Sequence, residues 1–181
     1  MTLTAGYDAL SRLCDYPEDR SRVLEDSVLV EDFMRERGLA ASLADFADFA
    51  SSSSLAALQE EYVGTFDFNP ATAPYLGHHL FGDNQKKGSY MMLLKREYSR
   101  WGYQPAGTEL VDHLSVVLGF LAHLSRQTGT EDSRSLVAVQ ILPGIERMGA
   151  AFDAKKGVRW KCLIEASRTL CAEGLREVVT C

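Results

Sequence analysis

Adjacent histidines are the first residues in this sequence that could do chemistry. His78 and His79, two of the four histidines among 181 residues, lie in the segment PYLGHHLFGD. A metal ion held by a helix needs ligands three or four positions apart, because neighbouring side chains point about 100° away from each other. No HExxH pattern is present. The spacing therefore favours a structural or hydrogen-bonding role, and no metal ligand is predicted.

Asp112 and His113 form the second candidate, because an aspartate that orients a histidine is a common catalytic arrangement. On a helix the two side chains would again diverge by about 100°. Two interpretations remain open: a functional pair, or an aspartate that supports a helix N-terminus beside a hydrogen-bonded histidine at the edge of the core. A small helical metal-dependent hydrolase using His78, His79, Asp112 and His113 is the enzymatic alternative.

Other signatures of catalysis are missing from the sequence. There is no GxSxG motif, and GDNQKKGS (82–89) lacks the GxxxxGK[ST] order of a phosphate-binding loop. That segment instead predicts a helix start capped by Asp83 or Asn84. No catalytic residue and no cofactor are predicted. Reduced, mostly buried thiols are predicted for the cysteines, which show no CxxC or zinc-finger spacing: Cys14, Cys162, Cys171 and Cys181.

Composition and charge restrict the class of protein. The hydrophobic fraction of 46% is typical of a soluble globular chain. No apolar stretch could span a membrane and no secretory signal pattern is present, so a cytoplasmic location without stable membrane insertion is predicted. Residues 1–66 carry 13 acidic and 5 basic side chains, whereas residues 67–181 carry 12 and 14. This balance disfavours nucleic-acid binding and fits either a cationic partner or a solvated face.

Helical periodicity runs through almost the whole chain and must position these residues. We predict an all-α fold, a single-domain helical bundle of about seven to nine helices over residues 1–181. Only residues 67–78 form a long irregular loop, since Pro70 and Pro74 forbid a continuous helix there. From the fourth helix onward the predicted ranges are about 55–66, 84–103, 109–126, 132–154 (interrupted at Pro143) and 158–178.

Two longer segments carry a family resemblance. EYVGTFDFNPATAPYLGHHLFGDNQKKGSYMMLLKREYSRWGY (61–103) and ELVDHLSVVLGFLAHL (109–124) resemble the TorD/DmsD/NarJ family of molybdoenzyme maturation chaperones, also called the nitrate reductase delta-subunit family. The motifs that carry the resemblance are EYxxxFD, HLFGD, the KGSYMMLL continuation and ExxDH. They cover roughly the middle third of the chain.

The resemblance implies a TorD-like, non-enzymatic cytoplasmic chaperone. Such a protein binds the N-terminal segment, often a twin-arginine leader, of the apo-catalytic subunit of a molybdopterin oxidoreductase while molybdenum cofactor is inserted. Proteins of cofactor biosynthesis are possible further partners, and the chaperone is a monomer or a homodimer. The client-binding groove implied by the family motifs is made of Tyr62, Phe66, Asp67, Tyr75, His79, Leu80, Phe81, Gly82, Asp83, Asp112 and His113.

Two further hypotheses accompany the resemblance. One of the neighbouring histidines, His78 or His79, is expected to pack inward while the other meets the client. A helical adaptor without any link to molybdoenzymes is the alternative to a maturation chaperone, because an aromatic-rich loop between helices can receive many amphipathic peptides.

Overall fold

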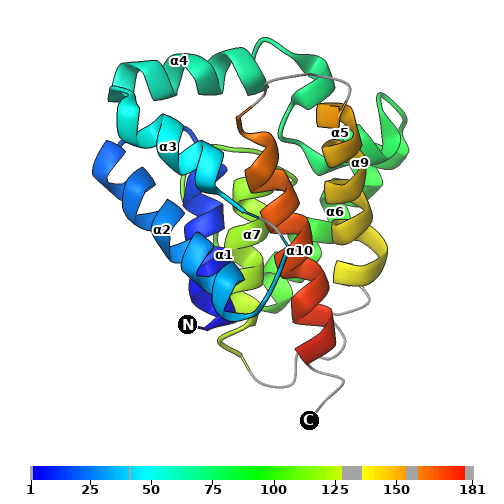
Figure 1. The fold of residues 1–181 in the computed structure, drawn as a ribbon. Helices are drawn as coiled ribbons and strands as arrows, with labels where there is room; N and C mark the ends of the chain where they lie inside the picture. Colours follow the sequence, from blue (N-terminus) through cyan, green and yellow to red (C-terminus); the bar gives the residue numbers. More distant parts are fainter. Residues whose placement is uncertain (1, 41, 128–135, 154–158, 178–181) are drawn as a thin grey trace.

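Helices account for the regular structure of the described chain, as the periodicity predicts (Figure 1). The computed structural model describes residues 2–40, 42–127, 136–153 and 159–177. Within these ranges there is no β-strand, and the all-α prediction is confirmed. The elements are α1 (Leu3–Leu13), α2 (Arg20–Glu36), α3 (Ala44–Ser52), α4 (Leu55–Phe66), the 3₁₀ turn η1 (Pro70–Thr72), α5 (Leu76–Phe81), α6 (Lys86–Arg100), α7 (Leu114–Leu124), the π-helical turn η2 (Val137–Ile141), α9 (Leu142–Asp153) and α10 (Lys161–Glu177).

The helix α7 lies in the middle of the molecule (Figure 1). Its sequence LSVVLGFLAHL is apolar on nearly every side, which is the pattern of a fully buried helix, and nine of its residues are buried. The helix α1 packs along α7 and also contacts α2 and α10. The helix α9 contacts both α10 and α5, so α5 is held against the bundle from the C-terminal side.

An aromatic cluster fills the core where α3, α4 and α10 meet. The ring of Trp160, which is 1% exposed, lies 5.0 Å from Phe46, 5.3 Å from Tyr62 and 5.6 Å from Phe66, measured between ring centroids. Edge-to-face packing of this kind stabilises a core beyond the area it buries. Tyr62 and Phe66 therefore belong to the hydrophobic core.

Local sequence signals fix several helix ends. Ser54 caps α4, with its Oγ accepting a hydrogen bond from the Ala57 N–H at 3.2 Å, and α4 spans the predicted 55–66. At the end of α2, Gly38 adopts a left-handed backbone with φ 63°, which lets the Leu39 N–H donate to the Met34 carbonyl at 2.9 Å. Glycine is favoured there because other residues are strained at positive φ.

Other predicted boundaries are wrong. The helix expected from about 109 begins at Leu114, because the residues before it form turns and a bridge to Tyr75. The loop predicted over 67–78 is broken by η1, and α5 begins inside it at Leu76. Pro143 is the second residue of α9 and follows η2 directly. Several residues of the predicted helices lie outside the described residues, as does Cys181: 132–135, 154, 158 and 178.

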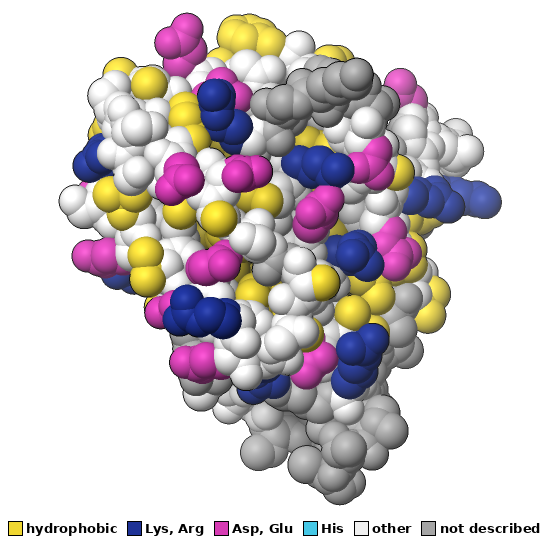
Figure 2. All heavy atoms as spheres, viewed as in Figure 1, with side chains coloured by type: hydrophobic (Ala, Val, Ile, Leu, Met, Phe, Trp, Pro, Cys, Tyr) yellow, Lys and Arg dark blue, Asp and Glu magenta, His cyan; other side chains and the backbone are white. Residues whose placement is uncertain are grey.

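Charged side chains of both signs are interspersed on the face shown in Figure 2. Ion pairs join the acidic first third of the chain to later basic residues: Arg126 pairs with Asp8, and Arg159 lies 3.7 Å from Glu61. The fold thus partly evens out the charge imbalance of the sequence. None of the helices in the described part of the chain has the length and apolarity of a transmembrane helix.

Candidate functional site

Asp112 supports a helix N-terminus, in agreement with one of the two interpretations of the sequence. The helix it supports is α5, however, and not α7, which follows Asp112 in the sequence. Its Oδ2 accepts a hydrogen bond from the Gly77 N–H at 3.1 Å, and Asp112 is fully buried. Tyr75, the N-cap residue of α5, provides no side-chain cap, so Asp112 replaces it from a distant segment. A Cβ on Gly77 would come within 2.7 Å of that oxygen, which explains glycine at this position.

His113 caps α7 and is buried. Its Nδ1 accepts a hydrogen bond from the Ser115 N–H at 3.2 Å and lies 2.7 Å from the Ser115 hydroxyl. An accepting Nδ1 places the ring proton on Nε2. The ring also packs edge-to-face on Tyr75, 5.3 Å between centroids. This is the hydrogen-bonded core histidine of the second interpretation, not the partner of a catalytic aspartate.

A two-sided backbone bridge ties the α5 segment to the start of α7. Tyr75 and His113 pair in antiparallel fashion. The Leu76 N–H donates to the Asp112 carbonyl at 2.9 Å, and the Leu114 N–H donates to the Pro74 carbonyl at 2.8 Å. Residues far apart in sequence are thereby held in one place.

Lowering the pH below about 6.5 is expected to reduce the free energy of unfolding, partly through His113. Burial lowers the pKa of His113 below its ordinary value of 6.5, so the unfolded chain binds this proton more readily than the folded protein. The stability contributed by this group is complete above that value. It falls as the pH drops through 6.5 and stops falling below the lowered pKa of the folded state.

Urea unfolding between about pH 7 and pH 5 measures this effect. In a His113→Asn variant, whose amide oxygen can still cap α7, stability should depend less on pH than in the wild type. Equal slopes for the two proteins would contradict the prediction.

The two adjacent histidines have different surroundings. His79 donates from Nε2 to the Ala73 carbonyl at 2.7 Å, and burial lowers its pKa. His78 is half-buried, with its ring 5.5 Å from that of His79. His79 is thus the one tied to the protein's own backbone, and contact of His78 with a client stays a prediction.

The metal-dependent hydrolase is not supported. Among the described residues there is no group of three or more His, Cys, Asp or Glu side chains that could hold a metal ion. His79, Asp112 and His113 already bond to the protein itself. The described cysteines are also poor nucleophiles: burial raises the pKa of Cys14, Cys162 and Cys171 to about 12.

The residues of the predicted groove separate into a buried and an exposed group. Tyr62, Phe66, Asp112 and His113 are at most 4% exposed and form the support. The remaining seven reach the surface at least in part: Asp67, Tyr75, His79, Leu80, Phe81, Gly82 and Asp83. Sequence periodicity cannot make this division where the chain is irregular, because exposure there depends on the fold.

Several of the surface residues are anchored by neighbouring helices. Phe81 packs on Tyr90 of α6, with ring centroids 5.7 Å apart. The Leu80 carbonyl accepts a hydrogen bond from Arg147 of α9 at 2.6 Å. After α5, Gly82 has φ 57° and ψ −135°, a conformation that only glycine adopts readily. The short helix α5 is therefore fixed at both ends.

An acidic–aromatic surface, which the sequence did not reveal as a unit, surrounds Tyr75. Burial raises the pKa of Tyr75 to about 12, and Glu109 and Asp67 add to the rise. The Tyr75 hydroxyl donates to Glu109 at 3.1 Å. We define this surface as Asp15, Tyr16, Asp67, Phe68, Tyr75 and Glu109.

Carboxylates of this surface act on the buried side chain of His113. Burial lowers the pKa of His113, whereas the negative charges of Glu109, Asp15, Asp112 and Asp67 act on it in the opposite direction. Three of these carboxylates lie in three separate segments of the chain and reach the surface at least in part. The fold thus concentrates negative charge above the buried histidine.

Two large aromatic side chains next to these carboxylates in the sequence are exposed. Phe68 is 82% exposed and follows Asp67, the C-cap residue of α4. Tyr16 is 43% exposed, with its ring 5.7 Å from that of buried Tyr62. In the motif FDF, Phe66, which the family motifs assigned to the groove, is buried, and Phe68, two positions later, is exposed.

Asp15 and Asp67 occupy electrostatically unfavourable positions. Asp15 follows Cys14, the C-cap of α1, and Asp67 is itself the C-cap of α4. The C-terminus of a helix carries partial negative charge, so a carboxylate there costs about 0.3–1 kcal/mol. A bound cationic group would remove that cost, and binding is one reason for such strain to persist.

The described part of the chain is thus an all-α protein with an exposed acidic–aromatic surface. The chain belongs to the nitrate reductase delta subunit family, which matches residues 34–148. That range contains the whole segment from α3 to α7, and most of α9.

Individual relatives agree with this assignment. The chain is 32% identical, over 118 residues, to the probable nitrate reductase molybdenum cofactor assembly chaperone NarJ of Bacillus subtilis (strain 168), with 64% of each chain covered. It is 31% identical over 84 residues to the nitrate reductase molybdenum cofactor assembly chaperone NarJ of Escherichia coli (strain K12), covering 46% of this chain and 36% of that one. The chain thus spans less than two thirds of either relative's length.

The fold is also shared with a solved structure. A crystal structure of an Archaeoglobus fulgidus protein assigned as a redox enzyme maturation protein superimposes with a TM-score of 0.62, covering 93% of both chains. The sequence identity is 20%, so this likeness supports the helical fold alone.

Proposed function

We propose that this protein is a cytoplasmic maturation chaperone that binds the N-terminal segment of the apo-catalytic subunit of a nitrate reductase or related molybdoenzyme. In this role it assists molybdenum cofactor insertion and catalyses no reaction of its own. Support comes from the family match and from the two NarJ relatives, whose names describe molybdenum cofactor assembly chaperones of nitrate reductase. The cytoplasmic location rests on the family resemblance.

One structural observation carries the proposal: the acidic–aromatic surface. A peptide with basic residues next to an apolar stretch needs opposite charge and an apolar bed. Asp15, Asp67 and Glu109 provide the charge, and the exposed ring of Phe68 provides apolar area beside it. The half-exposed residues Leu80 and Phe81 of α5 continue the apolar bed in this proposal.

The buried members of the predicted groove act indirectly. Asp112 binds the N-terminus of α5 through the Gly77 N–H, and the ring of His113 packs edge-to-face on that of Tyr75. Tyr62 and Phe66 hold α4 on the core, and α4 in turn presents Asp67. These four residues are positioning residues for the acidic–aromatic surface, with no direct contact to the client.

Charge reversal on the surface is expected to weaken client binding at least about tenfold. The ligand is a synthetic peptide with the N-terminal sequence of the nitrate reductase catalytic subunit from the same genome, and calorimetry measures its affinity. The test protein is Asp67→Lys with Glu109→Lys. The matched control, Asp45→Lys with Asp48→Lys, changes the net charge equally on exposed positions of α3, at the opposite end of α4.

The salt dependence gives a second readout. Wild-type affinity should fall as ionic strength rises, and the Asp67→Lys, Glu109→Lys protein should lose most of that dependence. Unchanged peptide affinity in the test protein, or an equal loss in the α3 control, would contradict the assignment of the site. Molybdenum content of the client, measured in a host that lacks this gene and carries each variant, tests the maturation role itself.

A further inference from the structure

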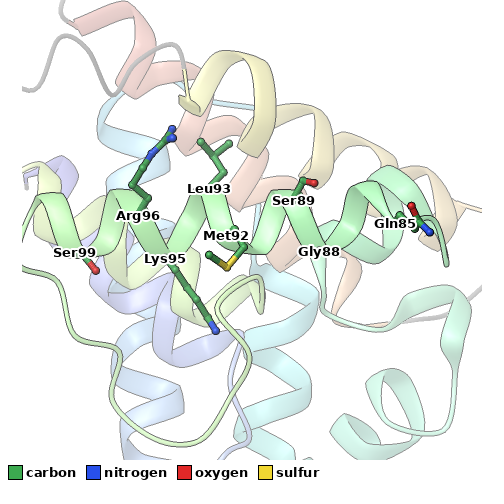
Figure 3. Close-up of a pocket in the computed structure, with 8 residues that line it drawn as sticks. All are labelled: Gln85, Gly88, Ser89, Met92, Leu93, Lys95, Arg96 and Ser99. Atoms are coloured by element: carbon green, nitrogen blue, oxygen red, sulfur yellow. The ribbon is translucent and has the colours of Figure 1, made fainter.

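The outward face of α6 carries a shallow, open depression, which is separate from the acidic–aromatic surface. A cavity of about 900 Å³ lies along it, lined by Gln85, Gly88, Ser89, Met92, Leu93, Lys95, Arg96 and Ser99 (Figure 3). A second cavity of about 330 Å³ adjoins it, sharing Leu93 and Arg96, and extends to Leu136, Val139 and Gln140 around η2. None of the residues of the acidic–aromatic surface or of the predicted groove lines either cavity.

The sequence of α6 explains the hollow. Its inner stripe, Tyr90, Leu94 and Tyr98, is buried in the core at four-residue spacing. The outer stripe contains the small residues Gly88 and Ser89, which leave room above the helix. The lined stretch runs from residue 85 to residue 99, about 21 Å along a helix axis at 1.5 Å per residue.

Apolar side chains are exposed in this hollow. Met92 is 66% exposed and Val139 is 61% exposed, and both are among the few large apolar residues on the surface of the described chain. Leu93 is half-buried beside them. Methionine adapts its shape to a partner, and small residues permit close approach of a second helix.

The charge of the hollow is positive, opposite to that of the acidic–aromatic surface. In Figure 3, Leu93 and Arg96 point to one side of α6 and Lys95 points to the other. The carboxylate that lines the second cavity, Glu97, is 8% exposed and lies 3.8 Å from Arg96 and 3.7 Å from Arg100. The charge presented to solvent is therefore that of the basic side chains.

We propose that the α6 groove, made of the residues lining the two cavities, binds an acidic amphipathic helix of a partner protein. Its apolar residues would lie over Gly88, Ser89 and Met92, and its carboxylates would meet Lys95 and Arg96. This surface is distinct from the one that binds the basic client segment, so the chaperone holds two polypeptide elements of opposite charge at once.

A protein helix fits the groove better than the other anionic partners. Nucleic acid requires an extended row of cations, whereas here three basic residues, Lys95, Arg96 and Arg100, flank an apolar centre on a chain of net charge −6. The apolar centre follows the single helix α6, so an elongated amphipathic helix matches it along its length. Charge complementarity and this elongated form point to the same occupant.

Fluorescence anisotropy with designed peptides tests the proposal. The probe is a labelled amphipathic peptide of about 18 residues, with leucines three and four positions apart and glutamates on the flanking positions. A second peptide carries lysine for each glutamate. The acidic peptide should bind at least about tenfold more tightly than the basic one, and Lys95→Glu with Arg96→Glu should reverse that preference.

Two controls make the outcome decisive. Arg35→Glu with Arg168→Glu changes the net charge equally on exposed positions of α2 and α10 and should leave acidic-peptide binding intact. Client-peptide affinity in calorimetry should be the same for Lys95→Glu, Arg96→Glu as for wild type, which separates this test from that of the proposed function. The proposal would be overturned if both designed peptides bound equally well. It would also be overturned if the protein bound no peptide but floated with phosphatidylglycerol vesicles in a manner that depends on Lys95 and Arg96.

Discussion

Replacing Asp112 with alanine is expected to lower the free energy of unfolding by about 2–4 kcal/mol. The change leaves the Gly77 N–H buried without its acceptor and opens a space beside Tyr90. Both effects act on α5, whose own N-cap residue cannot compensate. Urea unfolding followed by circular dichroism measures the loss.

An Asp112→Asn variant is the matched control, because its amide oxygen can still accept from Gly77. It should lose less than half as much stability as Asp112→Ala. Within the described residues, the second carboxylate oxygen of Asp112 has no hydrogen-bond partner, so the aspartate itself is not ideally satisfied. A loss below about 0.5 kcal/mol in Asp112→Ala would show that this carboxylate does not hold α5.

Replacing Phe66 with alanine is expected to cost about 3–5 kcal/mol of stability, whereas Phe68→Ala should change stability by less than about 0.5 kcal/mol. Phe66 is 2% exposed and touches the rings of Trp160 and Phe152. Phe68 is 82% exposed. Thermal unfolding of the two variants gives the comparison.

Client affinity should rank the same two residues in the opposite order. Phe68→Ala is expected to weaken binding of the N-terminal client peptide several-fold, because it removes an exposed ring from the acidic–aromatic surface. Val28→Ala, at a 57% exposed apolar position of α2, serves as the control and should leave affinity unchanged. If Phe68→Ala binds the peptide as well as the wild type does, the aromatic part of the proposed site is wrong.

Local signals made much of the fold predictable from the sequence. The helix α4 has a serine cap at one end, the first irregular residues at the other and a regular apolar stripe between them, and its bounds agree with the prediction. The predicted start of α7, at about residue 109, was wrong because Asp112 was expected to lie on that helix. Asp112 instead serves a helix 35 positions earlier, and His113 is the cap. No local pattern contains such a long-range choice.

The candidate site shows the same division. Tyr62 and Phe66 lie within the helix predicted over 55–66 and are buried in the core, whereas the family motifs assigned both to the groove. The carboxylate of Glu109 belongs to a segment that only the tertiary fold brings to Tyr75, and that of Asp15 to a segment that the fold brings near His113. The residue types predicted an acidic and aromatic surface. Which residues make up that surface could be found only from the three-dimensional structure.

In the proposed function, the bridge between Tyr75 and His113 affects how the client segment binds. Backbone hydrogen bonds on both sides of Tyr75, together with the bond from Thr72 to the Thr65 carbonyl, set the shape of this segment before any ligand arrives. A receptor already in its final shape loses little conformational entropy on binding, so most of the entropy loss comes from ordering the client peptide. We therefore expect the client peptide to become ordered when it binds, while residues 72–76 of the chaperone keep their conformation. Amide hydrogen exchange should then slow far more in the peptide than in residues 72–76.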